Sequence, residues 1–193
     1  MIKELLLVGT TVFALATSSV GVAKGVALHE EVRPQRGNHV SVAILNAAEA
    51  EAEAEAERLR IAALQENTDR VAAAIKKLNR HVNKTWYVFS GATPRGWDCS
   101  GLTMWFYEQL DVQLEHRASV QDDAGTKTNN PKPGDLVVFH YKGKTDAYHV
   151  GIYVGDGKMI HAPKRGHLTR VDDVVSFGGN YSTIEYRNLI ETL

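Results

Sequence analysis

The chain contains a single cysteine, Cys99, and this side chain is the one best suited to covalent chemistry. It follows Asp98 and opens a run of apolar residues at helical spacing: Leu102, Trp105, Phe106 and Leu110. We therefore expect Asp98 to cap a helix whose first turn contains Cys99. The partial positive charge of a helix N-terminus, with an imidazolium nearby, lowers the pKa of a thiol and favours the nucleophilic thiolate. The alternative interpretation is a small buried residue without chemistry, as most free cysteines are.

Two of the eight histidines, His149 and His161, are predicted to lie on one face of a β-hairpin. Short alternating runs predict three strands: residues 134–139, 149–154 and 158–162. Between the last two strands, Gly155-Asp156-Gly157 predicts a three-residue turn. With that turn Gly151 faces His161, and the two histidines become diagonal neighbours within reach of each other. A two-residue turn would place them on opposite faces.

These three side chains match the needs of nucleophilic catalysis, in which a nucleophile requires a base and the base an orienting partner. Cys99, His149 and His161 fill the three roles in that order. A zinc site of one cysteine and two histidines is the competing interpretation, but no CxxC, HExxH or HxE pattern supports it. His140 and His167 are less suitable substitutes, because neither shares the hairpin face. We expect no metal and no cofactor.

The composition excludes several classes of protein. The chain has 193 residues, 44% of them hydrophobic and 23% charged, which is typical of a globular protein and not of a disordered or multi-span membrane chain. Its 22 basic and 23 acidic residues give a formal charge of −1, which argues against binding through nucleic-acid phosphates. One cysteine excludes an intrachain disulfide and any multi-cysteine zinc finger.

The N-terminal part is predicted to carry no catalytic residue. Residues 5–23 lack any charge and lie between Lys3 and Lys24. Residues 1–27 therefore indicate either a secretory signal peptide or a membrane anchor, and both place the rest of the chain outside the cytoplasm. Residues 28–44, which contain a proline and a glycine among polar residues, are interpreted as a linker.

A long helix is expected to follow the linker. Residues 45–68 are rich in alanine and glutamate, both strong helix formers. Mostly apolar residues then recur at spacings of three and four and so define one face of the helix: Ile61, Leu64, Thr68, Val71, Ile75, Leu78 and Val82. In one interpretation this face packs on the following domain, residues 69–193. In the other it forms a coiled coil through which the protein self-associates.

Several motifs of the last 125 residues resemble those of the NlpC-type cell-wall peptidases. They are Tyr87-Val88-Phe89-Ser90-Gly91, Trp97-Asp98-Cys99-Ser100-Gly101-Leu102, Pro133-Gly134-Asp135-Leu136, His149-Val150-Gly151-Ile152-Tyr153 and Met159-Ile160-His161-Ala162. The resemblance covers about residues 70–190. It implies an α+β, papain-like fold, in which a catalytic helix packs on a small antiparallel sheet. It also implies hydrolysis of an amide bond in the peptidoglycan stem peptide, commonly the bond from the side chain of D-glutamate to a diamino acid.

The resemblance also assigns roles to residues. Cys99 matches the nucleophile, His149 the base and His161 the third polar residue. Three further positions match the family's substrate cleft, where the aspartate can meet a free amino group of the stem: Tyr87, Asp98 and Ser100.

Two motifs depart from the family pattern. Phe89-Ser90-Gly91 replaces the common Trp-Gly-Gly, and Gln121 comes two residues after Ser119 where the family often has three. An amidase or acyltransferase of the same fold, a wall-binding module without catalysis, and a phage lysin, tail-associated or endolysin, are the alternatives.

Overall fold

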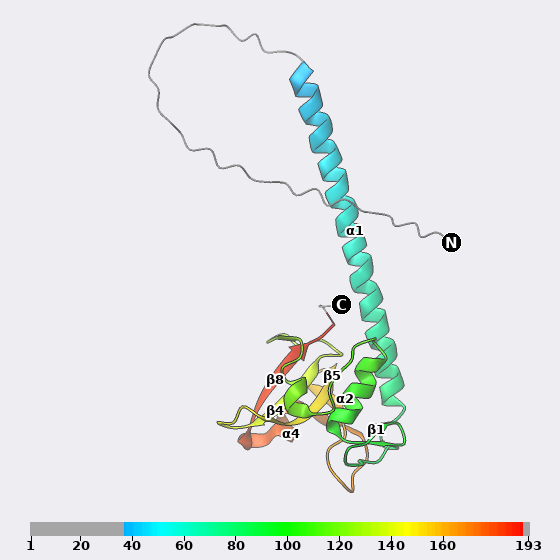
Figure 1. Cartoon of the computed structure of the whole chain (residues 1–193), viewed down its shortest axis with the longest axis vertical. Coiled ribbons are helices and arrows are strands. Elements are labelled where there is room, and N and C mark those ends of the chain that lie inside the picture. The colour runs from blue at the N-terminus through cyan, green and yellow to red at the C-terminus, as the bar shows by residue number, and fades with distance from the viewer. Residues whose placement is uncertain (1–36, 191–193) are drawn as a thin grey trace, which may run out of the picture. The chain divides into compact units, whose positions relative to one another are not determined.

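The computed structural model describes residues 37–190, with side chains from Val42 onward. Its first helix, α1, spans Gly37–Asn79 (Figure 1). Helix therefore covers residues 37–44, which were predicted as linker. No glycine or proline occurs between Gly37 and Gly91, so nothing in the backbone interrupts the helix once it has begun. The predicted leader or anchor, residues 1–27, lies outside the described residues.

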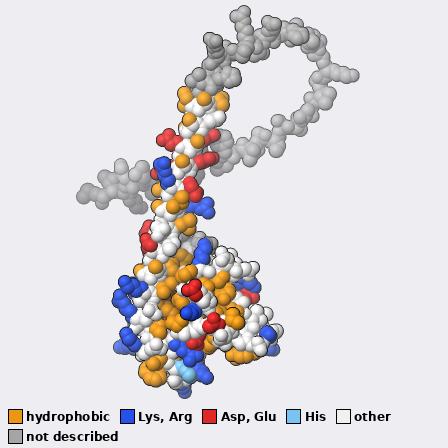
Figure 2. Space-filling model, turned by 180° about the vertical axis from the view of Figure 1, so that it is seen from behind, with side chains coloured by type: hydrophobic (Ala, Val, Ile, Leu, Met, Phe, Trp, Pro, Cys, Tyr) orange, Lys and Arg blue, Asp and Glu red, His pale blue; other side chains and the backbone are white. Residues whose placement is uncertain are grey.

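The two ends of the predicted apolar face of α1 lie in different environments. The chain divides after Ala47 into two units, and the later turns of α1 belong to the second. Val71 and Leu78 are buried in the core of this unit, whereas Ile61 and Leu64 are 57% and 49% exposed. Along the exposed part of α1, hydrophobic side chains alternate with acidic and basic ones (Figure 2). The helix thus packs on the domain from Val71 onward, and the coiled coil stays a prediction.

The domain is built on a six-stranded antiparallel sheet in the order β3-β8-β4-β5-β6-β7. Its strands are β3 Thr126–Lys127, β4 Leu136–Tyr141, β5 Ala147–Gly155, β6 Lys158–His161, β7 Arg170–Asp173 and β8 Ser182–Asn188. A separate pair consists of β1 Ala92–Thr93 and β2 Gly96–Trp97. The remaining helices are α2 Cys99–Glu108, α3 Ala118–Gln121, α4 Val174–Gly178 and the 3₁₀ turn η1 Gly179–Tyr181. The three strands expected from the alternating runs are β4, β5 and β6, and the α+β class is confirmed.

The core has two parts, one on each face of the sheet. On one face α2 and the last turns of α1 cover Leu136, Val138 and Val150. On the other face α4 contributes Val174 to a smaller cluster with Val137 and Phe139. Because side chains alternate along a strand, neighbouring residues of β4 enter opposite clusters.

The turn between β5 and β6 differs from the predicted one. It has two residues, Asp156 and Gly157, whose φ angles of 52° and 71° are both positive, as in a type I′ turn. The prediction of a three-residue turn was wrong. A β-bulge at Val154 adds one residue to β5 and shifts the register, so His149 and His161 still share one face of the hairpin.

Candidate active site

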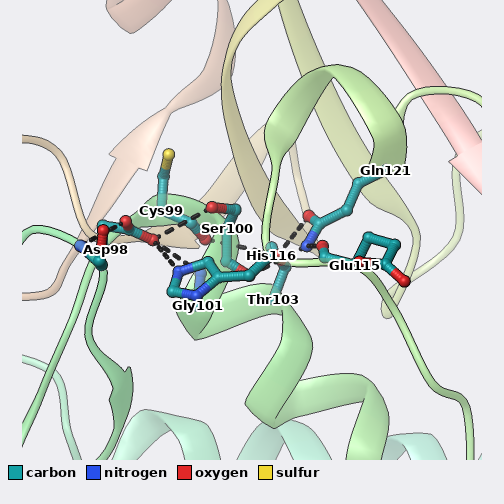
Figure 3. Close-up of polar contacts among 9 residues, drawn as sticks. Asp98, Cys99, Ser100, Gly101, Thr103, Glu115, His116 and Gln121 are labelled. Atoms are coloured by element: carbon teal, nitrogen blue, oxygen red, sulfur yellow. Dashed lines mark hydrogen bonds and ion pairs between the residues drawn. The ribbon is translucent and has the colours of Figure 1, made fainter.

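Cys99 is the first residue of α2, as the sequence predicts. Asp98 caps this helix, because its side-chain oxygen accepts a hydrogen bond of 2.8 Å from the backbone N–H of Gly101. The Cys99 side chain points away from the polar side chains that surround Asp98 (Figure 3). The sulfur at the capped end of α2 is therefore separated from the hydrogen bonds that Asp98 makes.

The electrostatic environment of Cys99 differs from the expected one. Burial, followed by the negative charge of Asp98, raises the pKa of the thiol from 9.0 to about 11. Hydrogen bonding from the backbone N–H groups of Val150, Ser100 and Cys99 itself lowers the pKa, but by less. The predicted lowering by the helix N-terminus is thus outweighed by desolvation. In the free protein Cys99 is a neutral thiol at pH 7.

The structure brings His149 into direct contact with His161. His149 Nε2 lies 2.7 Å from His161 Nδ1, and the two rings meet edge to face. Both histidines are buried, and the ring of Phe177 packs against each of them. The backbone N–H of Val150 is hydrogen-bonded to the sulfur of Cys99, and Val150 directly follows His149 on β5, so the sulfur lies against the β5 backbone next to His149.

Burial governs the charge of the histidine pair. It lowers the pKa of His149 well below 6.5, and His161 lowers it further. It also lowers the pKa of His161 to about 4, although Asp172 acts in the opposite direction. Both rings are therefore neutral at pH 7, which leaves one protonated and one free nitrogen on each.

Two polar residues that sequence reasoning missed extend this row of side chains. Asp172 Oδ2 lies 3.1 Å from His161 Nε2, and Arg170 donates to the same oxygen from Nε at 2.8 Å. Both residues are on β7, where Arg170 pairs directly with His161 and Asp172 is its diagonal neighbour. The sequence of β7, Arg-Val-Asp-Asp, has too little apolar alternation to predict a strand.

The carboxylate of Asp98 is in contact with several groups of the protein itself. Besides capping α2, its carboxylate accepts hydrogen bonds from Ser90 N–H at 2.9 Å and from Ser100 Oγ at 3.1 Å. His116 Nε2 lies 2.8 Å from the same carboxylate (Figure 3). Asp98 and Ser100 are both buried, and their observed contacts hold the chain around Cys99 in place. Their substrate contacts stay predictions, and His116 is a further residue that the sequence did not reveal.

Tyr87 lies within electrostatic range of Cys99. Burial raises the pKa of Tyr87, and the negative charges of ionised Cys99 and of Asp98 raise it further. Its backbone N–H donates to the carbonyl of His167, which ties this segment to the loop after β6. Tyr87 is half-buried and electrostatically coupled to Cys99, which is compatible with the predicted place in the cleft.

Gln121 holds α3 against α2. It is completely buried, and its amide donates to the carbonyls of Ser100 at 3.0 Å and Glu115 at 2.8 Å. Its oxygen accepts a hydrogen bond of 2.6 Å from Thr103. Gln121, at the altered spacing after Ser119, therefore makes structural contacts to Ser100, Thr103 and Glu115 (Figure 3).

The two substitute histidines lie elsewhere. His140 Nε2 is 2.8 Å from Asp122, which also pairs with Arg187 at 2.8 Å, so this histidine belongs to a buried polar network around Asp122. His167 lies in the loop between β6 and β7. Within residues 37–190 no group of three or more His, Cys, Asp or Glu side chains is arranged to hold a metal ion.

Comparisons with known proteins agree on one family. The model of the NlpC/P60 family matches residues 84–187, more than half of the chain. The murein DD-endopeptidase MepH of Escherichia coli K12 is 38% identical over 104 residues, which are 51% of this chain and 38% of MepH. The gamma-DL-glutamyl hydrolase of Bacillus subtilis 168 is 42% identical over 87 residues, 43% of this chain and 21% of that protein. The chain therefore spans well under half the length of either relative.

Solved structures show the same fold. The NlpC/p60 domain of the peptidoglycan hydrolase SagA has a TM-score of 0.53 and 32% identity, over 61% of this chain and 98% of that one. NlpC2 from Trichomonas vaginalis has a TM-score of 0.54 and 30% identity, over 62% and 46% of the two chains. The chain belongs to the NlpC/P60 family. The papain-like arrangement implied by the motifs is thereby confirmed.

Proposed function

We propose that the protein is a cysteine endopeptidase that hydrolyses an amide bond of the peptidoglycan stem peptide. Cys99 serves as nucleophile, His149 as base and His161 as the residue that orients His149. The observation that carries the proposal is the 2.7 Å contact between the two histidines, together with the hydrogen bond from the Val150 N–H, next to His149, to the Cys99 sulfur at the capped end of α2. The names of the relatives, an endopeptidase of murein and a glutamyl hydrolase, support the substrate class.

In this mechanism the thiol loses its proton only during attack. Because the resting thiol and imidazole are both neutral, His149 takes the Cys99 proton as the sulfur bonds to the amide carbonyl carbon. The imidazolium then gives this proton to the leaving amine as the C–N bond breaks. A water molecule, deprotonated by His149, attacks the thioester and releases the carboxylic acid and the thiol. The backbone N–H of Cys99 is expected to stabilise the oxyanion.

The bond proposed for cleavage joins the side chain of D-glutamate to a diamino acid. Tyr87, Asp98 and Ser100 are proposed to contribute to the cleft in which the stem peptide lies. Such a substrate lies outside the cytoplasm, so the protein is proposed to act in the cell envelope or as a secreted enzyme. No helix among residues 37–190 is long and apolar enough to cross a membrane. A tether through residues 5–23 and self-association through α1 stay proposals.

The test is digestion of purified cell walls, with mass spectrometry of the released fragments. Cys99→Ser and His149→Ala are expected to abolish cleavage, and His161→Ala to weaken it. His167→Ala, outside the histidine pair, serves as control and is expected to retain activity. Wild-type activity of Cys99→Ser would refute the mechanism. Fragment masses identify the bond, and release of products other than stem-peptide fragments would favour an amidase or acyltransferase.

A further inference from the structure

We propose that Asp172 is a positioning residue that sets the tautomers of His161 and His149, so that His149 presents an unprotonated nitrogen to Cys99. The inference builds on the function proposed above, since it concerns the base of that reaction. It rests on a continuous row of polar contacts from the interior to the edge of the sheet. None of the sequence motifs contains Asp172.

The carboxylate of Asp172, at the end of this row of contacts, fixes the direction of each hydrogen bond in it. A carboxylate only accepts hydrogen bonds, so the 3.1 Å contact requires a proton on His161 Nε2. A neutral His161 then has a free Nδ1, which accepts the hydrogen bond from His149 Nε2 at 2.7 Å. With its proton on Nε2, a neutral His149 has a free Nδ1. This nitrogen is the one left to take the thiol proton.

Arg170 keeps the carboxylate in place. Its guanidinium reaches Asp172 Oδ2 through Nε at 2.8 Å and through a terminal nitrogen at 2.7 Å, so it shares one oxygen with His161. The Asp172 side chain is 24% exposed, while that of His161 is fully buried. The carboxylate is therefore held by the guanidinium on one side while it accepts from His161 on the other.

Asp172 also affects the charge that forms during the reaction. When His149 takes the thiol proton, a buried imidazolium arises one ring away from the carboxylate. The titratable and charged groups acting on the pair are Asp172 and Arg170 from β7, besides the two rings themselves. The carboxylate favours the charged form and Arg170 opposes it, so loss of Asp172 makes the pair harder to protonate.

The first experiment reads the tautomers without using activity. The ¹⁵N shifts of the imidazole nitrogens are recorded for the full chain carrying Cys99→Ser, with and without Asp172→Ala. We expect the proton of His161 on Nε2 when Asp172 is present, and a mixture of tautomers in its absence. A His161 proton on Nδ1 with Asp172 in place, or an unchanged tautomer in Asp172→Ala, would overturn the proposal.

The second experiment measures kinetics against pH for three variants. Asp172→Ala is expected to lower kcat about 10- to 100-fold with KM changed less than about twofold. Asp172→Asn should lose less, about three- to tenfold, because Arg170 turns its amide oxygen toward His161 and preserves the tautomer without the charge. The matched control, Asp173→Asn, changes the neighbouring carboxylate that caps α4 and should leave kcat unchanged.

The pH profile separates positioning from mere loss of folding. In both Asp172 variants the acidic limb of kcat/KM is expected to move to lower pH, because the histidine pair becomes harder to protonate. An unmoved limb with wild-type kcat would refute the role of Asp172 while leaving the endopeptidase proposal intact. If Cys99→Ser were fully active, the endopeptidase proposal would fail instead, and the tautomer measurement would still decide the role of Asp172.

Discussion

The raised pKa of Cys99 predicts that the free protein reacts slowly with iodoacetamide. A change from 9.0 to about 11 lowers the thiolate population about 100-fold, equivalent to about 3 kcal/mol. At pH 7 about one molecule in 10⁴ carries the thiolate. Only this anion reacts, so alkylation of the folded protein should be at least about 100-fold slower than in urea.

Intact-protein mass spectrometry measures this reaction without ambiguity, because Cys99 is the only cysteine. Burial also hinders access, so the pH dependence is the decisive quantity. If the pKa is raised, the rate increases about tenfold per pH unit from pH 6 to pH 9 without levelling off. If the rate stopped rising before the pH reached 8, the thiol would not be neutral at pH 7. That result would indicate the thiolate–imidazolium pair expected from the helix N-terminus.

A substitution at Asp98 tests the cause of the raised pKa. Asp98→Asn removes the charge that raises the pKa of Cys99, and its amide oxygen can still cap Gly101. Alkylation of this variant should be several-fold faster than in the wild type at the same pH. His116→Ala, which leaves the Asp98 charge in place, is the control. An equal rate in Asp98→Asn would show that burial alone raises the pKa.

Two further predictions concern stability. Leu78→Ala removes a fully buried side chain and should lower the free energy of unfolding, measured by urea titration, by about 3 kcal/mol. Leu64→Ala, at a half-exposed position of α1, should change it by less than about 0.5 kcal/mol. Equal effects would contradict the packing of α1 from Val71 onward. Gly101→Ala would place a Cβ 1.9 Å from the carbonyl oxygen of Gly91. We therefore expect the free energy of unfolding to fall by about 3 kcal/mol or more, and wall cleavage to be lost. The control, Gly143→Ala, has open space around the new Cβ but a φ of +75°, and should lower the free energy of unfolding by only about 1 kcal/mol.

Local patterns predicted much of the site. The aspartate before an apolar helical run placed Cys99 at a helix start, because capping depends on residues three positions apart. The alternation of apolar and polar residues predicted β4, β5 and β6, because this pattern also depends only on residues close together in the chain. The predicted three-residue turn after β5 is wrong, yet the bulge at Val154 keeps His149 and His161 on one face of the hairpin. A bulge leaves no clear signal in a run of alternating residues.

Other features depend on contacts that are distant in the chain. His116 reaches Asp98 across 18 residues, and Asp172 reaches His161 only because β7 pairs with β6. Leu64 and Leu78 belong to the same sequence pattern, but Leu64 is half-exposed and Leu78 is buried. Which turns of α1 pack on the domain therefore depends on where the sheet and α2 lie.

The sequence by itself determined the α+β class and the family resemblance, and it predicted the nucleophile and the two histidines, because these follow from residue types and short-range spacing. Tertiary structure alone decided the charge state of the site. Burial of Cys99, to which the negative charge of the neighbouring Asp98 adds, reversed the expected direction of the thiol pKa. Desolvation depends on everything that surrounds a group, so no local pattern of residues could have shown it.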